Sequence, residues 1–239
     1  ALRGQLSQLA SALGDRVRTG DLAPSATIAD PSVASVALAP GAEASGSYTL
    51  EVTSLASAQT LASKSYSSAD DLVGDGTFTL RFGTVSGGNF AEDSSQSALA
   101  ITVDASDTVA TLADKINAAG SAVTAYVATN SSGAQLVLKG AEGAANGFVV
   151  EAQSNALLPS NQPGNLSYLG WEPSSDSGQL TRTASNATFL LDGVEFTGTS
   201  NSVDGLSGGL PLDLAATNIG APTRITFSDN SDRIEAVMN

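Results

Sequence analysis

The spacing of apolar residues changes twice between Leu99 and Lys139, and this change constrains the fold more than any other feature of the sequence. Apolar residues first alternate with small or polar ones, as in a half-buried strand, at Leu99, Ile101 and Val103. They then fall three or four residues apart, as on one face of a helix of about three turns, at Val109, Leu112, Ala113 and Ile116. We therefore expect a strand followed by an amphipathic helix, which Ser106 or Asp107 caps and Gly120 terminates.

A hairpin is expected directly after this helix. Alternating apolar residues predict its first strand, at Val123, Ala125 and Val127, and its second strand, at Leu136 and Leu138. Residues 130–133 between them have the composition of a tight turn. The whole segment thus predicts one strand, helix and hairpin unit.

The composition favours a mainly β (α+β) chain that does not bind nucleic acid. Short alternating segments recur between stretches rich in Gly, Ser, Thr, Asn and Asp, which are typical of turns. Ten basic and 24 acidic residues give a formal net charge of −14, whereas nucleic acids and anionic membrane surfaces both attract a basic protein face. Since the sequence also has no apolar run of membrane-spanning length, we expect no membrane insertion.

The sequence predicts no catalytic residue, metal ligand or cofactor. Cysteine and histidine are both absent, so a thiolate zinc site, a cysteine nucleophile and an imidazole base are all excluded. The acidic run at 70–75 does not have the spacing of a calcium loop, and the glycine-rich runs at 74–76 and 140–147 lack a phosphate-loop pattern. A carboxylate pair for glycoside hydrolysis stays open, because its separation is a three-dimensional property.

Helical patterns at both ends of the sequence predict a stalk. A leucine stripe runs along residues 1–20, at Leu2, Leu6, Leu9 and Leu13, and residues 231–238 begin a second helix. Such a stripe packs either on its own domain or, as a coiled-coil arm, on a helix that lies beyond residue 239. The two helical ends therefore indicate a fragment of a longer protein with a β-rich head on a helical stalk.

A long loop-like segment at 154–186 carries the only tryptophan of the chain, Trp171. Two interpretations are open. Trp171 and Tyr168 either form an exposed contact for a partner or a sugar ring, or the Trp171 indole covers the core beneath its own loop.

The order of motifs resembles that of the flagellar filament cap family, also called the hook-associated protein 2 family. The unit centred on Ile116 and Asn117 is similar to a short motif of bacterial flagellar axial proteins. A leucine-striped helix, a linker rich in Pro, Ser and Ala, and the segment SYTLEVTSLASAQTLAS precede it. A hairpin at Asp192-Gly193, the stretch at 200–203 and a strand at 222–229 follow it in the order typical of that family.

The resemblance implies a domain organisation with an insertion. Residues 1–33 would be a helical stalk remnant and linker, and residues 230–239 would begin the returning stalk helix. One β-rich head domain would be discontinuous, at 34–98 and 187–229, and the other, at 99–186, would be inserted within it.

The resemblance also implies a non-enzymatic structural protein that is secreted, oligomerises at the distal filament tip and promotes flagellin assembly. Its partners would be further copies of itself, flagellin, other hook-associated proteins and, for the full-length chain, an export chaperone. The stripe of Leu2, Leu6, Leu9 and Leu13 is assigned to packing of the stalk. A hook-filament junction protein or flagellin variant with the same motif is one alternative, and a surface adhesin or sugar-binding module is the other.

Overall fold

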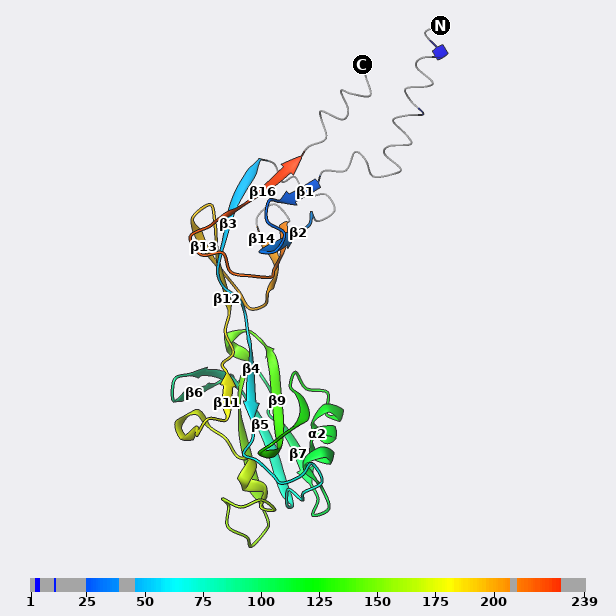
Figure 1. Ribbon diagram of the computed structural model, residues 1–239, viewed down its shortest axis with the longest axis vertical. Coiled ribbons are helices and arrows are strands. Elements are labelled where there is room, and N and C mark those ends of the chain that lie inside the picture. Colours follow the sequence, from blue (N-terminus) through cyan, green and yellow to red (C-terminus); the bar gives the residue numbers. More distant parts are fainter. Residues whose placement is uncertain (1–2, 5–10, 12–24, 39–45, 207–209, 229–239) are drawn as a thin grey trace. The chain divides into compact units, whose positions relative to one another are not determined.

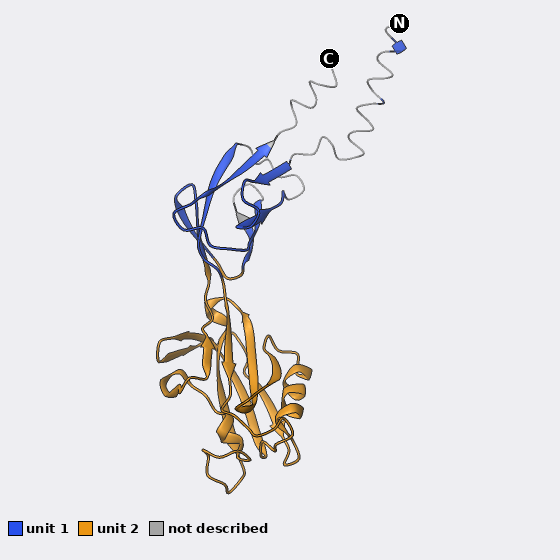
Figure 2. Cartoon of the chain, viewed as in Figure 1, with its two compact units in different colours: residues 1–55, 188–197, 201–239 blue, residues 56–187, 198–200 orange. Residues whose placement is uncertain are grey.

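A computed structural model describes residues 3–4, 11, 25–38, 46–206 and 210–228, and the predicted mainly β fold class is confirmed (Figure 1). The chain divides into two compact units (Figure 2). Unit 1 comprises residues 1–55, 188–197 and 201–239, and unit 2 comprises residues 56–187 and 198–200. Of the predicted stalk segments, residues 3–4, 11 and 25–33 are described, and residues 25–28 form a strand of unit 1 where the sequence predicts a linker.

Unit 1 contains an antiparallel sheet with the order β1-β16-β3-β12-β13 and a smaller one with the order β14-β15-β2. The strands of the larger sheet are β1 (Ser25–Ile28), β16 (Thr223–Ser228), β3 (Ser47–Ser54), β12 (Ala187–Leu191) and β13 (Val194–Gly198). Those of the smaller sheet are β14 (Ser202–Leu206), β15 (Leu210–Leu214) and β2 (Ala34–Val36). Leu50, Phe189 and Ile225 are fully buried in this unit.

The predicted hairpin at Asp192-Gly193 is confirmed. Both residues have positive φ angles, 51° and 81°, as the tight turn between β12 and β13 requires. The Asp192 carboxylate also accepts hydrogen bonds from the Thr49 N–H and hydroxyl, at 2.7 and 3.0 Å. The turn is thereby tied to β3.

Unit 2 contains two four-stranded sheets and helix α2 (Val109–Ala118). The first sheet consists of β10 (Gly147–Ser154), β5 (Gly76–Ser86), β6 (Asn89–Glu92) and β7 (Leu99–Val103). The second has the order β11-β4-β9-β8 and consists of β11 (Leu180–Arg182), β4 (Ala58–Ala62), β9 (Gly133–Glu142) and β8 (Thr124–Asn130). The predicted strand, helix and hairpin unit is therefore confirmed as β7, α2, β8 and β9.

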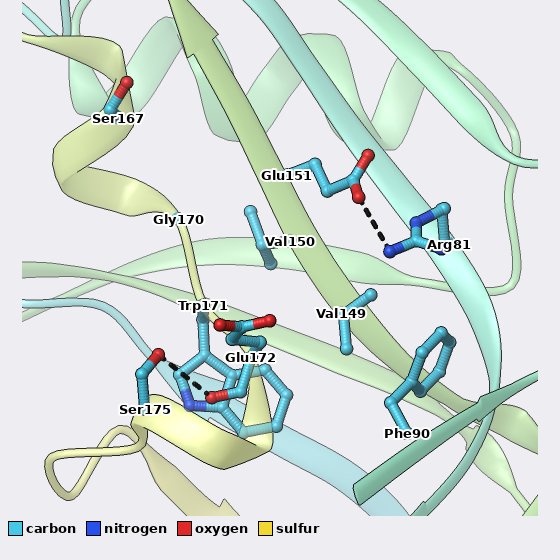
Figure 3. A pocket seen from close by; sticks show the side chains of 10 residues that line it. All are labelled: Arg81, Phe90, Val149, Val150, Glu151, Ser167, Gly170, Trp171, Glu172 and Ser175. Atoms are coloured by element: carbon cyan, nitrogen blue, oxygen red, sulfur yellow. Dashed lines mark hydrogen bonds and ion pairs between the residues drawn. The ribbon is translucent and has the colours of Figure 1, made fainter.

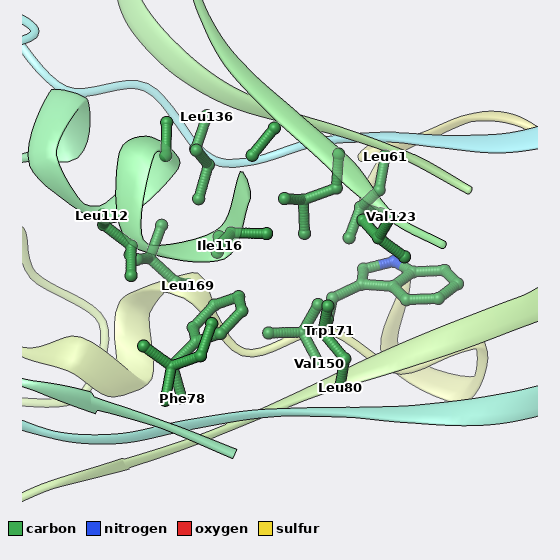
Figure 4. Packing of buried hydrophobic residues seen from close by; sticks show 14 of the residues in the cluster. Leu61, Phe78, Leu80, Leu112, Ile116, Val123, Leu136, Val150, Leu169 and Trp171 are labelled. Carbon is green, nitrogen blue, oxygen red and sulfur yellow. The ribbon is translucent and has the colours of Figure 1, made fainter. Parts of the chain in front are cut away.

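The core of unit 2 joins both sheets to one face of the helix (Figure 4). Phe78 and Leu80 come from β5, Leu136 from β9, and Leu112 and Ile116 from α2; all five are fully buried. A buried Leu or Phe side chain contributes about 1.5 to 3 kcal/mol relative to an exposed one. The apolar face of α2 is thus stabilised by tertiary packing more than by helix propensity.

The N-terminal cap of the helix differs from the one predicted, whereas the C-terminal glycine does not. Thr108, not Ser106 or Asp107, is the N-cap residue: its hydroxyl accepts from the Thr111 N–H, and the Thr111 hydroxyl accepts from the Thr108 N–H. Asp107 instead accepts from the Asp104 N–H and pairs with the Lys115 ammonium. At the other end Gly120 has a φ of 67°, the left-handed conformation predicted for it.

The division into units falls at a different place from the predicted domain boundary. The predicted discontinuous domain combines residues 34–98 with residues 187–229, whereas the structure places residues 56–98 in unit 2. The reason is strand pairing, because β5 lies between β10 on one side and β6 and β7 on the other. Alternation identifies β5 as a strand, but it does not identify these partners.

Two carboxamide side chains close open strand edges in unit 2. The Gln59 amide donates to the Phe148 C=O at 2.8 Å and accepts from the Phe148 N–H at 3.0 Å, so it joins β4 to the outer edge of β10. Asn117 in α2 makes the same pair of bonds to Ala125 in β8, both at 2.8 Å. Each amide thus satisfies both backbone groups of one residue.

A third carboxamide, in unit 1 just before the start of β16, bonds to backbone groups of two residues of β3. Asn218 accepts from the Val52 N–H at 2.6 Å and donates to the Leu50 C=O at 3.0 Å, both in β3. We call these three side chains, Gln59, Asn117 and Asn218, the carboxamide clamps.

The Gln59 clamp can be tested by removing its polar atoms. Gln59→Leu leaves the buried N–H and C=O of Phe148 unpaired, so we expect it to lower the free energy of unfolding by about 2 to 3 kcal/mol. Gln153→Leu is the matched control, because Gln153 is an exposed residue of β10. Urea unfolding should shift the midpoint of the first variant strongly and that of the second by little; equal shifts would contradict the clamp.

Candidate functional site

Trp171 lies in the core of unit 2. Its side chain is only 4% exposed, and its backbone N–H and C=O bond to those of Val150, both at 2.9 Å. The indole N–H donates to the Asp176 carboxylate at 2.8 Å. The ring therefore covers the core beneath its own loop and presents no exposed face for stacking a sugar or a partner side chain.

Asp176 organises the loop that follows Trp171. The same carboxylate oxygen accepts from the backbone N–H groups of Gln179 and Leu180, at 3.0 and 3.1 Å. The indole hydrogen bond is the largest influence on the pKa of Asp176, and together with the backbone N–H groups it lowers this pKa although burial opposes the change. A charged Asp176 thus fixes the position of the tryptophan.

Tyr168, the other predicted contact residue, is half-buried. Its hydroxyl donates to the Ser65 C=O at 3.2 Å, and its ring packs edge-on against Tyr66 with centroids 5.4 Å apart. The Lys64 ammonium lies 5.2 Å from the centroid of the Tyr168 ring. These contacts are all internal to unit 2 and give Tyr168 a packing role.

Tyr66 carries a buried hydroxyl group that has no hydrogen-bond partner in the structure. The residue is 1% exposed, and burial, reinforced by Tyr168 and Asp71, raises the pKa of its phenol. The neutral phenol stabilises the folded state relative to the phenolate. This contribution is present below about pH 10, where the unfolded phenol ionises, and is lost as the pH rises further.

Tyr66→Phe tests this pH dependence. We expect the unaltered protein to lose about 1 kcal/mol more unfolding free energy than Tyr66→Phe between pH 8 and pH 11, and the variant to be no less stable at pH 8, because it removes an unpaired hydroxyl. Tyr126→Phe, at a side chain that is 53% exposed, is the control and should keep the alkaline loss. Equal alkaline losses in the Tyr66 and Tyr126 variants would contradict the assignment.

A cavity of about 310 Å³ lies beside Trp171 (Figure 3). We call it the Trp171 pocket. Strands β5, β6 and β10 and the segment containing the short helices η2 (Leu166–Leu169) and η3 (Pro173–Ser175) surround it. Its lining includes Arg81, Phe90, Val149, Glu151, Trp171 and Glu172.

Ion pairs within the first sheet of unit 2 hold the arginine of this pocket. One nitrogen of the Arg81 guanidinium lies 2.9 Å from the Glu92 carboxylate and another lies 2.7 Å from that of Glu151. The guanidinium carbon also lies 5.7 Å from the centroid of the Phe90 ring, within the range of a cation–π contact. Arg81 is therefore already neutralised by its neighbours.

The hydroxyl groups at the pocket are engaged in hydrogen bonds with the backbone. Its hydroxyl groups, Ser167 and Ser175, bond to backbone carbonyls, the first to Ala152 and the second to Glu172. Across the residues that the structure describes, no group of three or more acidic side chains could hold a metal ion. No helix in that part of the chain is long and apolar enough to cross a membrane.

The predicted stalk stripe of Leu2, Leu6, Leu9 and Leu13 lies outside the described residues. The structure does describe every element of the strand, helix and hairpin unit. There the motif residue Ile116 is fully buried in the core, and Asn117 is one of the carboxamide clamps.

Comparison with known proteins shows which protein family this unit resembles. A family model described as the flagellin hook IN motif matches residues 79–142. The A-type flagellar hook-associated protein 2 of Pseudomonas aeruginosa is 31% identical over 201 residues, and the match covers 79% of this chain. The crystal structure of FliD (HAP2) from Pseudomonas aeruginosa PAO1 superposes with a TM-score of 0.66 at 26% identity, over 87% of this chain and 92% of that chain.

This chain is a homologue of the flagellar cap proteins. The crystal structure of the flagellar cap protein FliD D2-D3 domains from Escherichia coli matches 86% of the chain, and 99% of that structure, with a TM-score of 0.70. At 22% identity this match shows the fold. The resemblance predicted from the order of motifs is therefore confirmed, and the chain spans 39% of the length of its curated relative.

Proposed function

We propose that this chain is the head portion of a flagellar filament cap, a structural component that oligomerises at the distal filament tip and promotes flagellin assembly. The observation that carries the proposal is the agreement of the sequence match with the structural matches. The curated relative at 31% identity is a hook-associated protein 2, and solved flagellar cap proteins share the fold over most of the chain.

A non-enzymatic role is part of the proposal. Its support is the pocket chemistry: the serines at the Trp171 pocket bond to backbone carbonyls, and the Arg81 guanidinium is bound by two carboxylates. The adhesin alternative loses its main support, since the Trp171 ring is buried.

Assembly is assigned to the predicted stalk. We propose that the stripe of Leu2, Leu6, Leu9 and Leu13 packs against other stalk helices, because an apolar stripe at this spacing needs a partner surface. The head would then project from the stalk as a secreted structure. Its partners would be further copies of the chain, flagellin, other hook-associated proteins and, before export, a chaperone.

Immunogold electron microscopy of cells that express the full-length parent, with antibody raised against this chain, tests the proposal. We expect label at the distal filament tip. Label at the hook junction, along the filament or on the cell body would contradict it and would favour a junction protein, a flagellin or an adhesin respectively.

The same experiment tests the stripe. Leu6→Asp combined with Leu9→Asp should remove label from the tip and leave secreted, unassembled protein in the medium. Gln5→Asp combined with Gln8→Asp adds the same charge beside the stripe and should keep tip label. Tip label that survives the leucine variant would contradict the assignment of the stripe to assembly.

A further inference from the structure

We propose that unit 2 of one copy of this chain binds unit 2 of a second copy, through a projecting leucine of the first and an apolar groove of the second. We call the two surfaces the Leu157 knob, which is residues 155–163, and the Leu99 groove, which is lined by residues 82, 96–99, 119 and 121–122. The inference rests on the proposed function, because it names the surfaces through which neighbouring heads would meet.

The Leu157 knob is an ordered loop that holds an apolar side chain in solvent. Leu157 is fully exposed, and the neighbouring Leu158 is 50% exposed. The Asn155 N–H donates to the Asp75 C=O at 3.0 Å, and the buried Asn165 amide donates to the Leu158 C=O. Hydrogen bonds therefore maintain a loop conformation that leaves Leu157 without burial, which is typical of a side chain that another molecule covers.

The Leu99 groove is an open hollow at the C-terminal end of α2, with a volume of about 380 Å³. Its apolar surface comes from Phe82 in β5, Leu99 in β7 and three alanines, Ala98, Ala119 and Ala122. The remaining lining residues are Gln96 and two serines, so no charged residue lines the groove. A hollow of this size accepts a leucine side chain together with part of the loop that carries it.

Knob and groove lie at different ends of β5. Ser154 pairs with Gly76 at one end of this strand, and the knob follows Ser154 directly (Figure 1). The groove lies at Phe82, six residues farther along the strand, which corresponds to about 20 Å. The Gly164 C=O also packs closely against Gly74, which holds the loop beyond the Gly76 end. A contact between the two surfaces therefore joins two copies head to tail, an arrangement that closes into a ring or continues as a fibre.

The charge of the chain favours a second copy as the occupant. At a formal net charge of −14 two copies repel each other, so they approach most closely on surfaces that carry no charge. Residues 154–171 contain no charged side chain, and neither does the lining of the groove. A basic partner would be attracted to carboxylates elsewhere on the chain and would find no opposite charge at these two surfaces.

Sedimentation velocity of the 239-residue chain, up to millimolar concentration, tests the contact. Leu6→Asp and Leu9→Asp are present throughout, so that the stalk stripe does not contribute. We expect a mass that rises with concentration, and stronger association at high salt, because salt screens the repulsion and does not weaken an apolar contact. Leu157→Ser should weaken association about tenfold or more, which corresponds to the burial of one leucine.

Ile219→Ser is the matched control for Leu157→Ser. Its side chain is 69% exposed in unit 1, outside both surfaces, so we expect association to be unchanged. Thermal unfolding midpoints of both variants would establish that each remains folded.

Introduced cysteines identify the two surfaces, because the chain contains no cysteine of its own. Leu157→Cys and Ala122→Cys, in separate chains, should form a mixed disulfide when the two proteins are combined with a mild oxidant. Each protein alone should form few dimers, as a head-to-tail contact requires. Ser174→Cys, at an exposed position of unit 2 outside the groove, replaces Ala122→Cys in the control mixture.

Four results would overturn the inference. They are a chain that stays monomeric at millimolar concentration, association that Leu157→Ser does not change, association that high salt weakens, and mixed disulfide no more abundant than in the control or in Leu157→Cys alone. Each of these can occur with tip label present, and label away from the tip can occur with the mixed disulfide present. The inference and the proposed function therefore fail separately.

Discussion

The carboxamide clamps are the interaction on which the rest of this structure depends. A strand edge that is buried without partners leaves N–H and C=O groups unpaired, at a cost of about 1 to 3 kcal/mol for each. Gln59 meets this requirement where β4 approaches the edge of β10, so the two sheets of unit 2 can enclose one core. Asn117 does the same between α2 and β8, and Asn218 does so in unit 1.

Local features of the fold could be predicted from the sequence. Apolar periodicity identified β7, α2 and the β8–β9 hairpin, because each has a long enough pattern of one period. Asp192-Gly193 identified its turn, because the backbone there requires positive φ angles. The position of the helix cap differed by one or two residues, since Ser106, Asp107 and Thr108 are all suitable cap residues.

Non-local features could not be predicted in this way. Gln59 lies in a segment of small and polar residues, SLASAQTLAS, where a buried glutamine and a surface glutamine look alike. The pairing of β5 with β10 joins residues that lie about seventy positions apart. Because the sequence does not reveal this pairing, it does not predict that residues 56–98 belong to unit 2. Four segments that are separate in the sequence line the Trp171 pocket. The sequence therefore predicts neither the pocket, nor the burial of Trp171 beside it, nor the ion pairs of Arg81.

The Gln59 and Asn117 clamps and the apolar core hold unit 2 together, and charged groups remain at its surface and at the Trp171 pocket. The chain as a whole is acidic, with a formal net charge of −14, and such a charge influences which proteins it can approach. The homology to flagellar cap proteins gives this head its proposed place in the filament.

Hydrogen exchange at the Phe148 amide tests the clamp most directly, because the Gln59 side chain is the recorded acceptor for this N–H. We predict that NMR will show the Phe148 amide hydrogen exchanging as slowly as that of Val150. Val150 lies in the same strand as Phe148, and its N–H donates to the Trp171 C=O. Fast exchange of Phe148 beside a protected Val150 would show that the clamp does not close this edge, and it would contradict the account.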